Sequence, residues 1–288
     1  MKHEITGHTR LTALLGSPVS HSISPQMHNE AFRQLGLDYV YLAFDVRPER
    51  LKEVFNGLKL MDIQGFNLTM PLKKEIIPLL DGLTPAARLA GSVNTVYREG
   101  DRFIGHTTDG TGYMRSVSNA GHDIIGKKMT LLGAGGAATA ICVQAALDGV
   151  ASIDVFKRKN SSFAQMATFC KKVSGETGCI IRLFDLADMI QLSKSISESV
   201  ILTNATNVGM APDTEGCPLP NASMLHPGLI VSDIIYNPRE TTLLAQAKQT
   251  GCQILNGLYM LLFQGAASFT CWTGQDMPVE LIRKKYFK

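Results

Sequence analysis

The chain has 288 residues, of which 45% are hydrophobic and 18% are charged, and its formal net charge at pH 7 is +3. This composition is typical of a soluble globular protein with one large or two ordinary domains, and it excludes a disordered or fibrous chain. The positive charge is too small and too scattered to predict nucleic-acid binding. The composition leaves a homodimer open.

The cysteines and the apolar runs restrict the location of the protein. The six cysteines show no C-x-x-C spacing and no cluster with other metal ligands, which predicts free thiols in a reducing compartment and no metal site. No apolar run reaches the roughly 18 residues that a membrane span requires, and the first residues lack the apolar core of a signal peptide. We therefore expect a cytoplasmic protein that does not bind a membrane.

The first part of the chain alternates between predicted strands and helices. Apolar and alternating patterns predict strands over 11–16, 39–46 and 65–70, with helical patterns over 26–35 and 50–60 between them. This β-α-β-α-β order predicts an α/β domain with parallel strands.

Three serines alternate before the first predicted helix, at Ser20, Ser22 and Ser24. With Pro25 at the first helical position, Ser24 is predicted to cap the helix N-terminus. That interpretation leaves the hydroxyl of Ser22 available to bind a polar ligand.

Further polar side chains follow strand ends in the same domain. Asn67 and Thr69 are spaced by two within an apolar strand, and Lys73 follows the break at its end. Asn94 lies in another short predicted strand, and Asp109 closes a polar loop among glycines. The carboxyl ends of strands are where α/β folds bind ligands, although a lysine after a proline or an aspartate before a glycine is also common on a plain surface turn.

The second half contains a glycine-rich turn between a strand over 129–132 and a helix over 137–147. Gly133, Gly135 and Ala138 fit the dinucleotide fingerprint G-x-G-x-x-G/A, and a second strand over 152–156 completes a βαβ unit. Phosphates would bind at the N-terminus of the helix. Later buried strands over 200–204, 229–236 and 251–257 continue the α/β alternation. A last apolar helix over 259–272 carries Gln264, which its pattern places at a partly exposed position.

A basic run follows the second strand of this βαβ unit, Lys157-Arg158-Lys159-Asn160. An NAD enzyme would place an acid there. Asp154 lies 154 − 133 = 21 residues after Gly133 and matches by count, yet it falls inside the strand. We expect Arg158, with Lys157 or Lys159, to bind a 2′-phosphate. A solvated basic turn is the alternative.

Taken in order, these residues resemble the shikimate dehydrogenase family over essentially the whole chain. The matching motifs are Ser22-Ile-Ser-Pro25, Asn67-Leu-Thr-Met-Pro-Leu-Lys73, Asn94-Thr95, Thr108-Asp109-Gly110, Gly133-Ala-Gly-Gly136, Asn204-Ala-Thr-Asn-Val-Gly-Met210, Asp233-Ile-Ile-Tyr236 and Met260-Leu-Leu-Phe-Gln264-Gly. Two stretches, 121–149 and 261–272, look most like the branch that includes quinate/shikimate dehydrogenases.

The resemblance implies an α/β fold with two domains. Residues 1–112, completed by the returning helices of 257–288, would form the substrate-binding catalytic domain, and residues 113–256 a Rossmann-like domain for NADP(H). The implied activity is the reversible NADPH-dependent reduction of 3-dehydroshikimate to shikimate, in the pathway to chorismate and aromatic amino acids.

It also implies roles for individual residues. Lys73 and Asp109 would form the catalytic pair and also contact the substrate. Its carboxylate would be bound by Ser22 and Ser24 with help from Tyr236, and its ring hydroxyls by Asn67, Thr69, Asn94, Asp109 and Gln264. The cofactor-binding residues implied are Gly133, Ala134, Gly135, Gly136, Ala137, Lys157, Arg158, Lys159, Thr206, Asn207, Met210, Ile234 and Gly257.

Three positions depart from common members of the family, namely Leu72, Thr107 and Tyr259. None removes a catalytic group, but they leave open whether shikimate or quinate is the better substrate and whether NAD(H) is also used. A non-catalytic metabolite-binding protein is a further alternative, against which the presence of both Lys73 and Asp109 argues.

Overall fold

The computed structural model describes residues 4–287, which form two compact units. The first unit combines Met1–Gly112 with Leu262–Lys288, and the second is Tyr113–Leu261. The predicted domain ends at residues 1–3 and 288 lie outside the described residues. The second dividing point falls inside helix α9 (Leu258–Thr273), 261 − 256 = 5 residues later than the sequence predicts. Gly257, the residue before α9, is bonded to the second unit, because its N–H donates to the Ile235 carbonyl.

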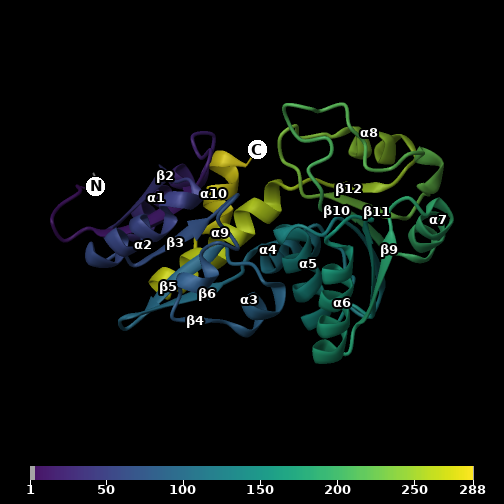
Figure 1. Cartoon of the computed structure of the whole chain (residues 1–288). Helices are drawn as coiled ribbons and strands as arrows, with labels where there is room; N and C mark the ends of the chain where they lie inside the picture. The colour runs from purple at the N-terminus through teal and green to yellow at the C-terminus, as the bar shows by residue number, and fades with distance from the viewer. Residues whose placement is uncertain (1–3, 288) are drawn as a thin grey trace. The chain divides into compact units, whose positions relative to one another are not determined.

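The first unit is a six-stranded sheet with helices on both faces (Figure 1). Its strand order is β2-β1-β3-β5-β6-β4. The first three strands are parallel, β5 is antiparallel to β3 and β6, and β4 is parallel to β6. Its elements are β1 (Arg10–Gly16), α1 (Ser24–Leu35), β2 (Tyr39–Asp45), α2 (Leu51–Leu60), β3 (Gly65–Leu68), β4 (Gly82–Leu83), α3 (Pro85–Ala90), β5 (Thr95–Glu99), β6 (Arg102–His106), most of α9, and α10 (Val279–Tyr286).

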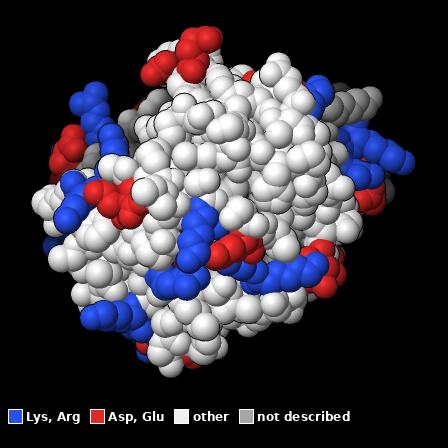
Figure 2. Space-filling model, turned by 90° about the vertical axis from the view of Figure 1, so that its right-hand side faces the viewer, with Lys and Arg blue, Asp and Glu red and all other residues white. Residues whose placement is uncertain are grey.

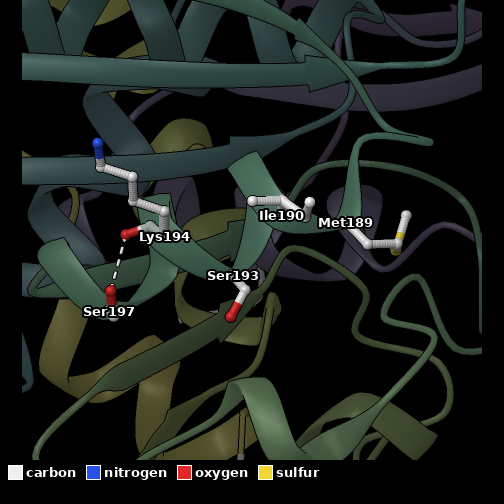
Figure 3. Close-up of a pocket in the computed structure, with 5 residues that line it drawn as sticks. All are labelled: Met189, Ile190, Ser193, Lys194 and Ser197. Carbon is white, nitrogen blue, oxygen red and sulfur yellow. Dashed lines mark hydrogen bonds between the residues drawn. The ribbon is translucent and has the colours of Figure 1, made fainter.

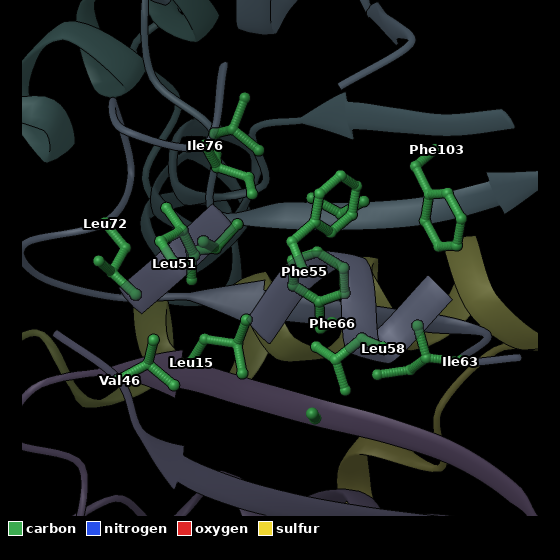
Figure 4. Close-up of a cluster of buried hydrophobic side chains, with 14 of the residues drawn as sticks. Leu15, Val46, Leu51, Phe55, Leu58, Ile63, Phe66, Leu72, Ile76 and Phe103 are labelled. Carbon is green, nitrogen blue, oxygen red and sulfur yellow. The ribbon is translucent and has the colours of Figure 1, made fainter. Parts of the chain in front are cut away.

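One face of this sheet packs against α2. Ala13 and Leu15 of β1 and Phe66 of β3 point to this face and contact Phe55 and Leu58 of α2 in a continuous apolar core (Figure 4). Since side chains alternate along a strand, the residues between them must face the opposite side. Asn67 therefore points away from α2.

The opposite face packs against α1 and α9 through aromatic rings. His28 of α1 stacks on Tyr41 of β2 at 4.4 Å between ring centroids, and Phe269 and Trp272 of α9 complete the cluster. The Trp272 indole N–H donates to the Val96 carbonyl at 3.0 Å. Offset and tilted ring pairs of this kind add to the free energy of burial. Helix α9 is therefore part of the first unit's core.

Two glycines let α9 approach this closely. A Cβ on Gly65 would lie 2.3 Å from Cδ1 of Trp272, and a Cβ on Gly265 would lie 2.2 Å from Cε of Met27. Gly65 thus requires the absence of a side chain, because indole and backbone atoms block it, whereas a side chain at Gly265 would have to displace the flexible end of Met27. The fit between α1, β3 and α9 depends on them.

The second unit is a six-stranded sheet in which all strands are parallel. The order β12-β11-β10-β7-β8-β9 reverses direction between β7 and β10, as in dinucleotide-binding folds. Helices α7 and α8 cover one face, as shown by the apolar cluster of Leu192, Ile196 and Leu243 with Leu132 and Val231. The strands are β7 (Lys128–Leu132), β8 (Ser152–Lys157), β9 (Ile180–Asp185), β10 (Ile201–Asn204), β11 (Ile230–Asp233) and β12 (Gln253–Leu255). The helices are α4 (Asp109–Asn119, shared with the first unit), α5 (Gly136–Leu147), α6 (Phe163–Thr177), α7 (Met189–Glu198) and α8 (Thr242–Gln249).

The α/β class predicted from the sequence is confirmed, but the start of α1 differs from its predicted form. The helix begins at Ser24 itself, after Ile23, and no side-chain oxygen caps it in the way predicted for Ser24. Instead the Ser22 hydroxyl accepts a hydrogen bond from the Ser24 N–H at 3.2 Å. The prediction for Ser24 was therefore wrong, because its own backbone is already helical, and the hydroxyl of Ser22 has a local partner.

Three other predicted elements have different limits. Strand β3 ends at Leu68, so Thr69 lies just beyond it, with its methyl group against Gly16. Asn94 precedes β5 instead of lying within it. Asp109 occupies the first turn of α4 instead of a loop end. In each case the polar residue stands at the end of an element.

The surface carries charged side chains of both signs. On the face shown in Figure 2, Lys and Arg side chains are interleaved with Asp and Glu side chains. None of the helices formed by residues 4–287 combines the length and the apolar character needed to span a bilayer.

Buried His28 leads to a prediction about acid stability. Burial lowers the pKa of His28 from 6.5 to about 3. Between these pH values the unfolded chain binds a proton that the folded chain does not, so stability is full above about pH 6.5 and falls as the pH drops. We expect His28→Phe to reduce this slope by up to about 1.4 kcal/mol per pH unit.

Urea unfolding of the wild type and the variant from pH 4 to pH 8 measures the slope. His8→Gln, at an exposed histidine, is the control and should leave the slope unchanged. Equal slopes for wild type and His28→Phe would show that His28 does not titrate as its burial requires.

Candidate functional site

A lysine and a carboxylate form a close pair at one end of the first unit's sheet. The Lys73 ammonium donates to Oδ2 of Asp109, with 2.5 Å between the two atoms. The Lys73 side chain is 21% exposed and the Asp109 side chain 8% exposed. The pair is therefore shielded from water on most sides, yet the ammonium remains open to a ligand.

The second oxygen of Asp109 is held by Asn94. The Asn94 Nδ2 donates to Oδ1 of Asp109 at 2.8 Å, so each carboxylate oxygen accepts a charge-assisted hydrogen bond from a different residue. Asp109 also opens α4, where the positive end of the helix dipole favours a negative charge. These contacts fix the direction of the carboxylate.

The backbone of Thr108 decides which way the Asn94 amide points. The Thr108 N–H donates to the Asn94 Oδ1 at 2.7 Å, so this side of the amide must be the oxygen. The Nδ2 is then turned toward Asp109, and it also lies 3.2 Å from Oε1 of Gln264. The Thr108 N–H thus determines that the Asn94 nitrogen is the group that donates to Asp109.

A second amide, that of Asn67, is fixed from the opposite side. The Tyr41 hydroxyl donates to the Asn67 Oδ1 at 2.8 Å. The Asn67 Nδ2 then faces the Asn94 carbonyl at 3.0 Å and the hydroxyls of Thr95 and Ser268. Asn67 is only 5% exposed. Its amide hydrogens point to protein acceptors, and the contact of Asn67 with ring hydroxyls stays a prediction.

The serines near the start of α1 are connected to the same network. Ser24 is buried, and its side chain is hydrogen-bonded to Tyr41. Ser22 lies two residues earlier at the N-terminus of α1, a 12-residue helix. A continuous series of contacts therefore runs from Ser24 through Tyr41 and Asn67 toward Asp109.

The second unit presents a glycine turn between β7 and α5. Gly133 has φ +114°, and a Cβ there would lie 2.7 Å from the Ala205 carbonyl oxygen. Gly135 is the residue before α5, and a Cβ there would meet nothing within 4 Å. Gly133 thus permits the turn, and Gly135 leaves open space beside the helix N-terminus. This is the arrangement that accommodates a pyrophosphate.

The loops after β10 and β11 are tied to each other through side chains. Asn204 Nδ2 donates to Asp233 at 3.1 Å, and the Asn204 Oδ1 accepts from the N–H and hydroxyl of Thr206. Burial raises the pKa of the Asp233 carboxyl. Gly257 lies against the loop that follows β11, since a Cβ at Gly257 would be 1.9 Å from the Ile234 carbonyl oxygen.

The basic run ends β8 as predicted, and its members differ in their contacts. Lys157 donates to the Asn160 side chain, with 2.5 Å between Nζ and Oδ1, whereas Arg158 and Lys159 are exposed. The Asn160 oxygen also accepts from Ser162. The turn is thus fixed internally and presents Arg158 and Lys159 to solvent.

Asp154 matches the expected ribose-binding acid by residue count, but it is fully buried and its carboxylate already has partners within the protein. Its carboxylate accepts from Lys128 at 2.8 Å, from Arg182 at 2.7 Å and from Ser195 at 2.8 Å. Burial alone would raise the pKa of Asp154, but these three donors lower it. The carboxylate therefore stays ionised within the sheet and is not available to a ribose hydroxyl.

The structure brings part of the predicted set together within each unit. In the first unit, Asn67, Lys73, Asn94, Asp109 and Gln264 are joined by direct contacts or shared partners. In the second unit, the glycine turn follows β7, residues 206–210 follow β10, and Ile234 follows β11, with Gly257, after β12, packed against it. Tyr236 follows β11 and is 37% exposed.

A surface hollow on α7 is separate from all these residues. It is lined by Met189, Ile190, Ser193, Lys194 and Ser197 (Figure 3). The Ser197 hydroxyl bonds to the Lys194 carbonyl of its own helix at 2.9 Å. The hollow contains no titratable pair and no predicted site residue.

Several supporting residues were missed by sequence reasoning. Tyr41, Thr95 and Ser268 carry the network but match no catalytic pattern by themselves. A signal was present for Ser268, since it lies four residues after Gln264 and thus on the same face of α9. The stripe of buried polar groups at Asn67, Tyr41 and Ser268 only becomes visible once the sheet is assembled.

Comparison with known proteins shows which families and solved structures the chain is similar to. The family model of the shikimate dehydrogenase substrate binding domain matches residues 14–96, and that of the shikimate 5'-dehydrogenase C-terminal domain matches residues 257–285. A shikimate dehydrogenase (NADP(+)) of Listeria monocytogenes is 55% identical over 98% of this chain and 97% of its own. A quinate/shikimate dehydrogenase of Escherichia coli is 41% identical over 98% of each chain. The crystal structure of a Listeria monocytogenes shikimate 5-dehydrogenase in complex with shikimate and NAD has a TM-score of 0.94, with 54% identity over 99% of this chain and 98% of that one.

The two glycine environments predict opposite effects of one added methyl group. Gly135→Ala should fold with a stability within about 1 kcal/mol of wild type, because φ −78° and open space suit alanine. It should weaken NADP+ binding at least about tenfold by blocking close approach to the backbone. Gly257→Ala should cost about 3 kcal/mol or more, because its Cβ collides with the Ile234 carbonyl.

Chemical unfolding and NADP+ titration of both variants measure these effects. Unchanged NADP+ affinity in Gly135→Ala would show that the turn does not approach the dinucleotide. Wild-type stability in Gly257→Ala would show that the contact with Ile234 is not a tight one.

Proposed function

This chain belongs to the shikimate dehydrogenase family of oxidoreductases, and we propose that it catalyses the reversible reduction of 3-dehydroshikimate to shikimate with NADP(H) as the preferred cofactor. The observation that carries the proposal is the Lys73–Asp109 pair, whose carboxylate is held on both oxygens and whose ammonium stays open to a ligand. Reduction of a ketone needs a proton for the oxygen, and this pair supplies it.

The cofactor, when bound, supplies a hydride to the carbonyl carbon. As negative charge develops on the carbonyl oxygen, the Lys73 ammonium hydrogen-bonds to it and then transfers its proton, which leaves a neutral amine and an alcohol. In the reverse direction the amine of Lys73 accepts the hydroxyl proton. Asp109 aims the ammonium and balances its charge, so the two groups act as a unit.

The first unit is proposed as the substrate domain. Its ring-hydroxyl ligands would be Thr69, Asn94, Asp109 and Gln264, with Asn67 acting through the network it supports. Ser22 and Ser24 stand at the N-terminus of α1, where the positive end of the helix dipole favours a carboxylate, and Tyr236 would assist them.

The second unit is proposed as the cofactor domain. The turn of Gly133–Ala137 would hold the pyrophosphate, and Arg158 with Lys157 or Lys159 the 2′-phosphate. Thr206, Asn207, Met210, Ile234 and Gly257 follow neighbouring strand ends, and we assign them to the rest of the dinucleotide. The burial of Asp154 inside β8 supports NADP(H) over NAD(H). Its carboxylate does not lie at the end of the strand, where it would repel the 2′-phosphate.

Use of quinate is the second candidate activity, since the Escherichia coli relative is named a quinate/shikimate dehydrogenase. Steady-state assays with shikimate and quinate, each with NADP+ and NAD+, distinguish the two. A cytoplasmic location, which the six free thiols support, and a homodimer stay predictions, to be tested by cell fractionation and light scattering.

Replacement of the catalytic lysine should separate chemistry from binding. We expect Lys73→Ala to lower kcat for shikimate oxidation by about 10² to 10⁴-fold, the range for one general acid/base, with a much smaller effect on shikimate affinity. The neighbouring exposed Lys74 provides the control, and Lys74→Ala should keep wild-type kcat. A kcat of Lys73→Ala close to that of wild type would remove Lys73 from the mechanism.

Replacement of the exposed arginine should change cofactor choice. We expect Arg158→Ala to lower kcat/KM for NADP+ by about tenfold or more and to leave that for NAD+ nearly unchanged, because only NADP+ carries the 2′-phosphate. Lys171→Ala removes one charge from the surface of α6 and is the control. Equal losses with both cofactors, or a wild-type enzyme that prefers NAD+, would contradict the assignment.

A further inference from the structure

A buried hydroxyl on α9 joins the returning helix to the polar network behind the catalytic pair. Ser268 is 0% exposed. Its Oγ donates to the Gln264 carbonyl at 3.0 Å, accepts from the Asn67 Nδ2 at 2.9 Å, and lies 2.7 Å from Oγ1 of Thr95 and 3.2 Å from Oγ1 of Thr108. Four polar groups thus surround one buried hydroxyl, and their arrangement calls for a physical explanation.

The direction of the hydrogen bonds follows from the single proton of Ser268. Since that proton goes to the Gln264 carbonyl, Ser268 accepts from Asn67, and its second lone pair is open to the hydroxyl of Thr95 or of Thr108. Donation therefore runs from Tyr41 to Asn67, from Asn67 to Ser268, and from Ser268 to the backbone of α9. Through Ser268 this series of hydrogen bonds is connected to helix α9.

Removal of the acceptor would affect Asn94 next. Without the Ser268 oxygen, the Thr95 and Thr108 hydroxyls keep each other at 3.2 Å and the Asn94 Oδ1, which they share as an acceptor at 3.1 and 3.2 Å. That oxygen is the one whose bond from the Thr108 N–H orients the amide toward Asp109. Competition at this oxygen would loosen the donor that Asp109 receives.

We propose that Ser268 is a positioning residue for the reaction, which holds the Asn94 amide and the Gln264 turn of α9 in register with the Lys73–Asp109 pair. This inference rests on the proposed function. It differs from a purely structural role because its effect passes through Asn94 to Asp109, and because Gln264 and Ser268 share one face of α9 at i and i+4.

The first test compares kcat for shikimate oxidation in Ser268→Ala and in Ser199→Ala. Ser199 is a matched control in the second unit, because it is also buried, donates to a carbonyl four residues earlier and bonds to a threonine hydroxyl. We expect Ser268→Ala to lower kcat about tenfold, equal to about 1.4 kcal/mol, and Ser199→Ala to keep it. Ser268→Thr, which retains the hydroxyl, should recover most of the loss.

The second test is a double-mutant cycle with Asp109→Asn. If Ser268 acts through the Lys73–Asp109 pair, Ser268→Ala should cause little further loss of kcat in the Asp109→Asn background. A loss of the same factor in both backgrounds would overturn the proposal and leave a structural role. This comparison holds even if both variants are less stable than wild type.

Fluorescence of the single tryptophan monitors the seating of α9, since Trp272 lies one turn after Ser268 and bonds to β5. An unchanged spectrum with a reduced kcat supports positioning, and an undiminished kcat refutes it. If Ser268→Ala changes the spectrum, the Asp109→Asn cycle decides between the two roles. Wild-type protein that fails to oxidise shikimate would instead refute the proposed function, so the two failures are distinguishable.

Discussion

The orientation of one amide governs the first unit's site. The Thr108 N–H gives the Asn94 side chain a defined oxygen side, so that its nitrogen side meets Asp109. Asn67 is fixed in the same way by the Tyr41 hydroxyl. Buried amides with every polar atom engaged are costly to rotate, because a flip would set two acceptors or two donors against each other. The catalytic carboxylate inherits its direction from these constraints.

This network needs a close fit between a C-terminal helix and an N-terminal sheet. Gly65 allows α9 to approach β3 at a distance that a side chain would prevent, and Gly265 leaves room for the Met27 side chain of α1. The aromatic rings of His28, Tyr41 and Trp272 fill the remaining space, and they exclude water from the polar stripe beside them. The low local dielectric then strengthens every hydrogen bond in the stripe. Residues 201 positions apart in the sequence, Asn67 and Ser268, can therefore contribute to one site.

The sequence predicted what depends on local periodicity and on motifs. The α/β class, the glycine turn at 133–138, the basic run at 157–159 and the family were all visible in the order of residues, and the class and family are confirmed. Limits of elements were less accurate: α1 begins at Ser24, one residue before its predicted start, and Asp109 lies in the first turn of α4 instead of a loop end. The hydrogen bonds that decide such limits form in three dimensions. Tyr41 and Ser268 could not be predicted as neighbours, since nothing local to either residue indicates the other. The roles assigned to the individual site residues stay predictions.

The two units build their sites from different parts of the chain, and this explains why one site is easier to read from sequence than the other. In the second unit the decisive features are backbone geometry, as at Gly133 with its positive φ and at Gly257 against the Ile234 carbonyl. Such positions select glycine and produce a recognisable motif. In the first unit the decisive features are side-chain hydrogen bonds, in which serine, threonine and asparagine could each serve in several arrangements. Physical constraint is equally strong there, but it acts on the directions of protons between distant residues, and these directions leave no fixed spacing in the sequence.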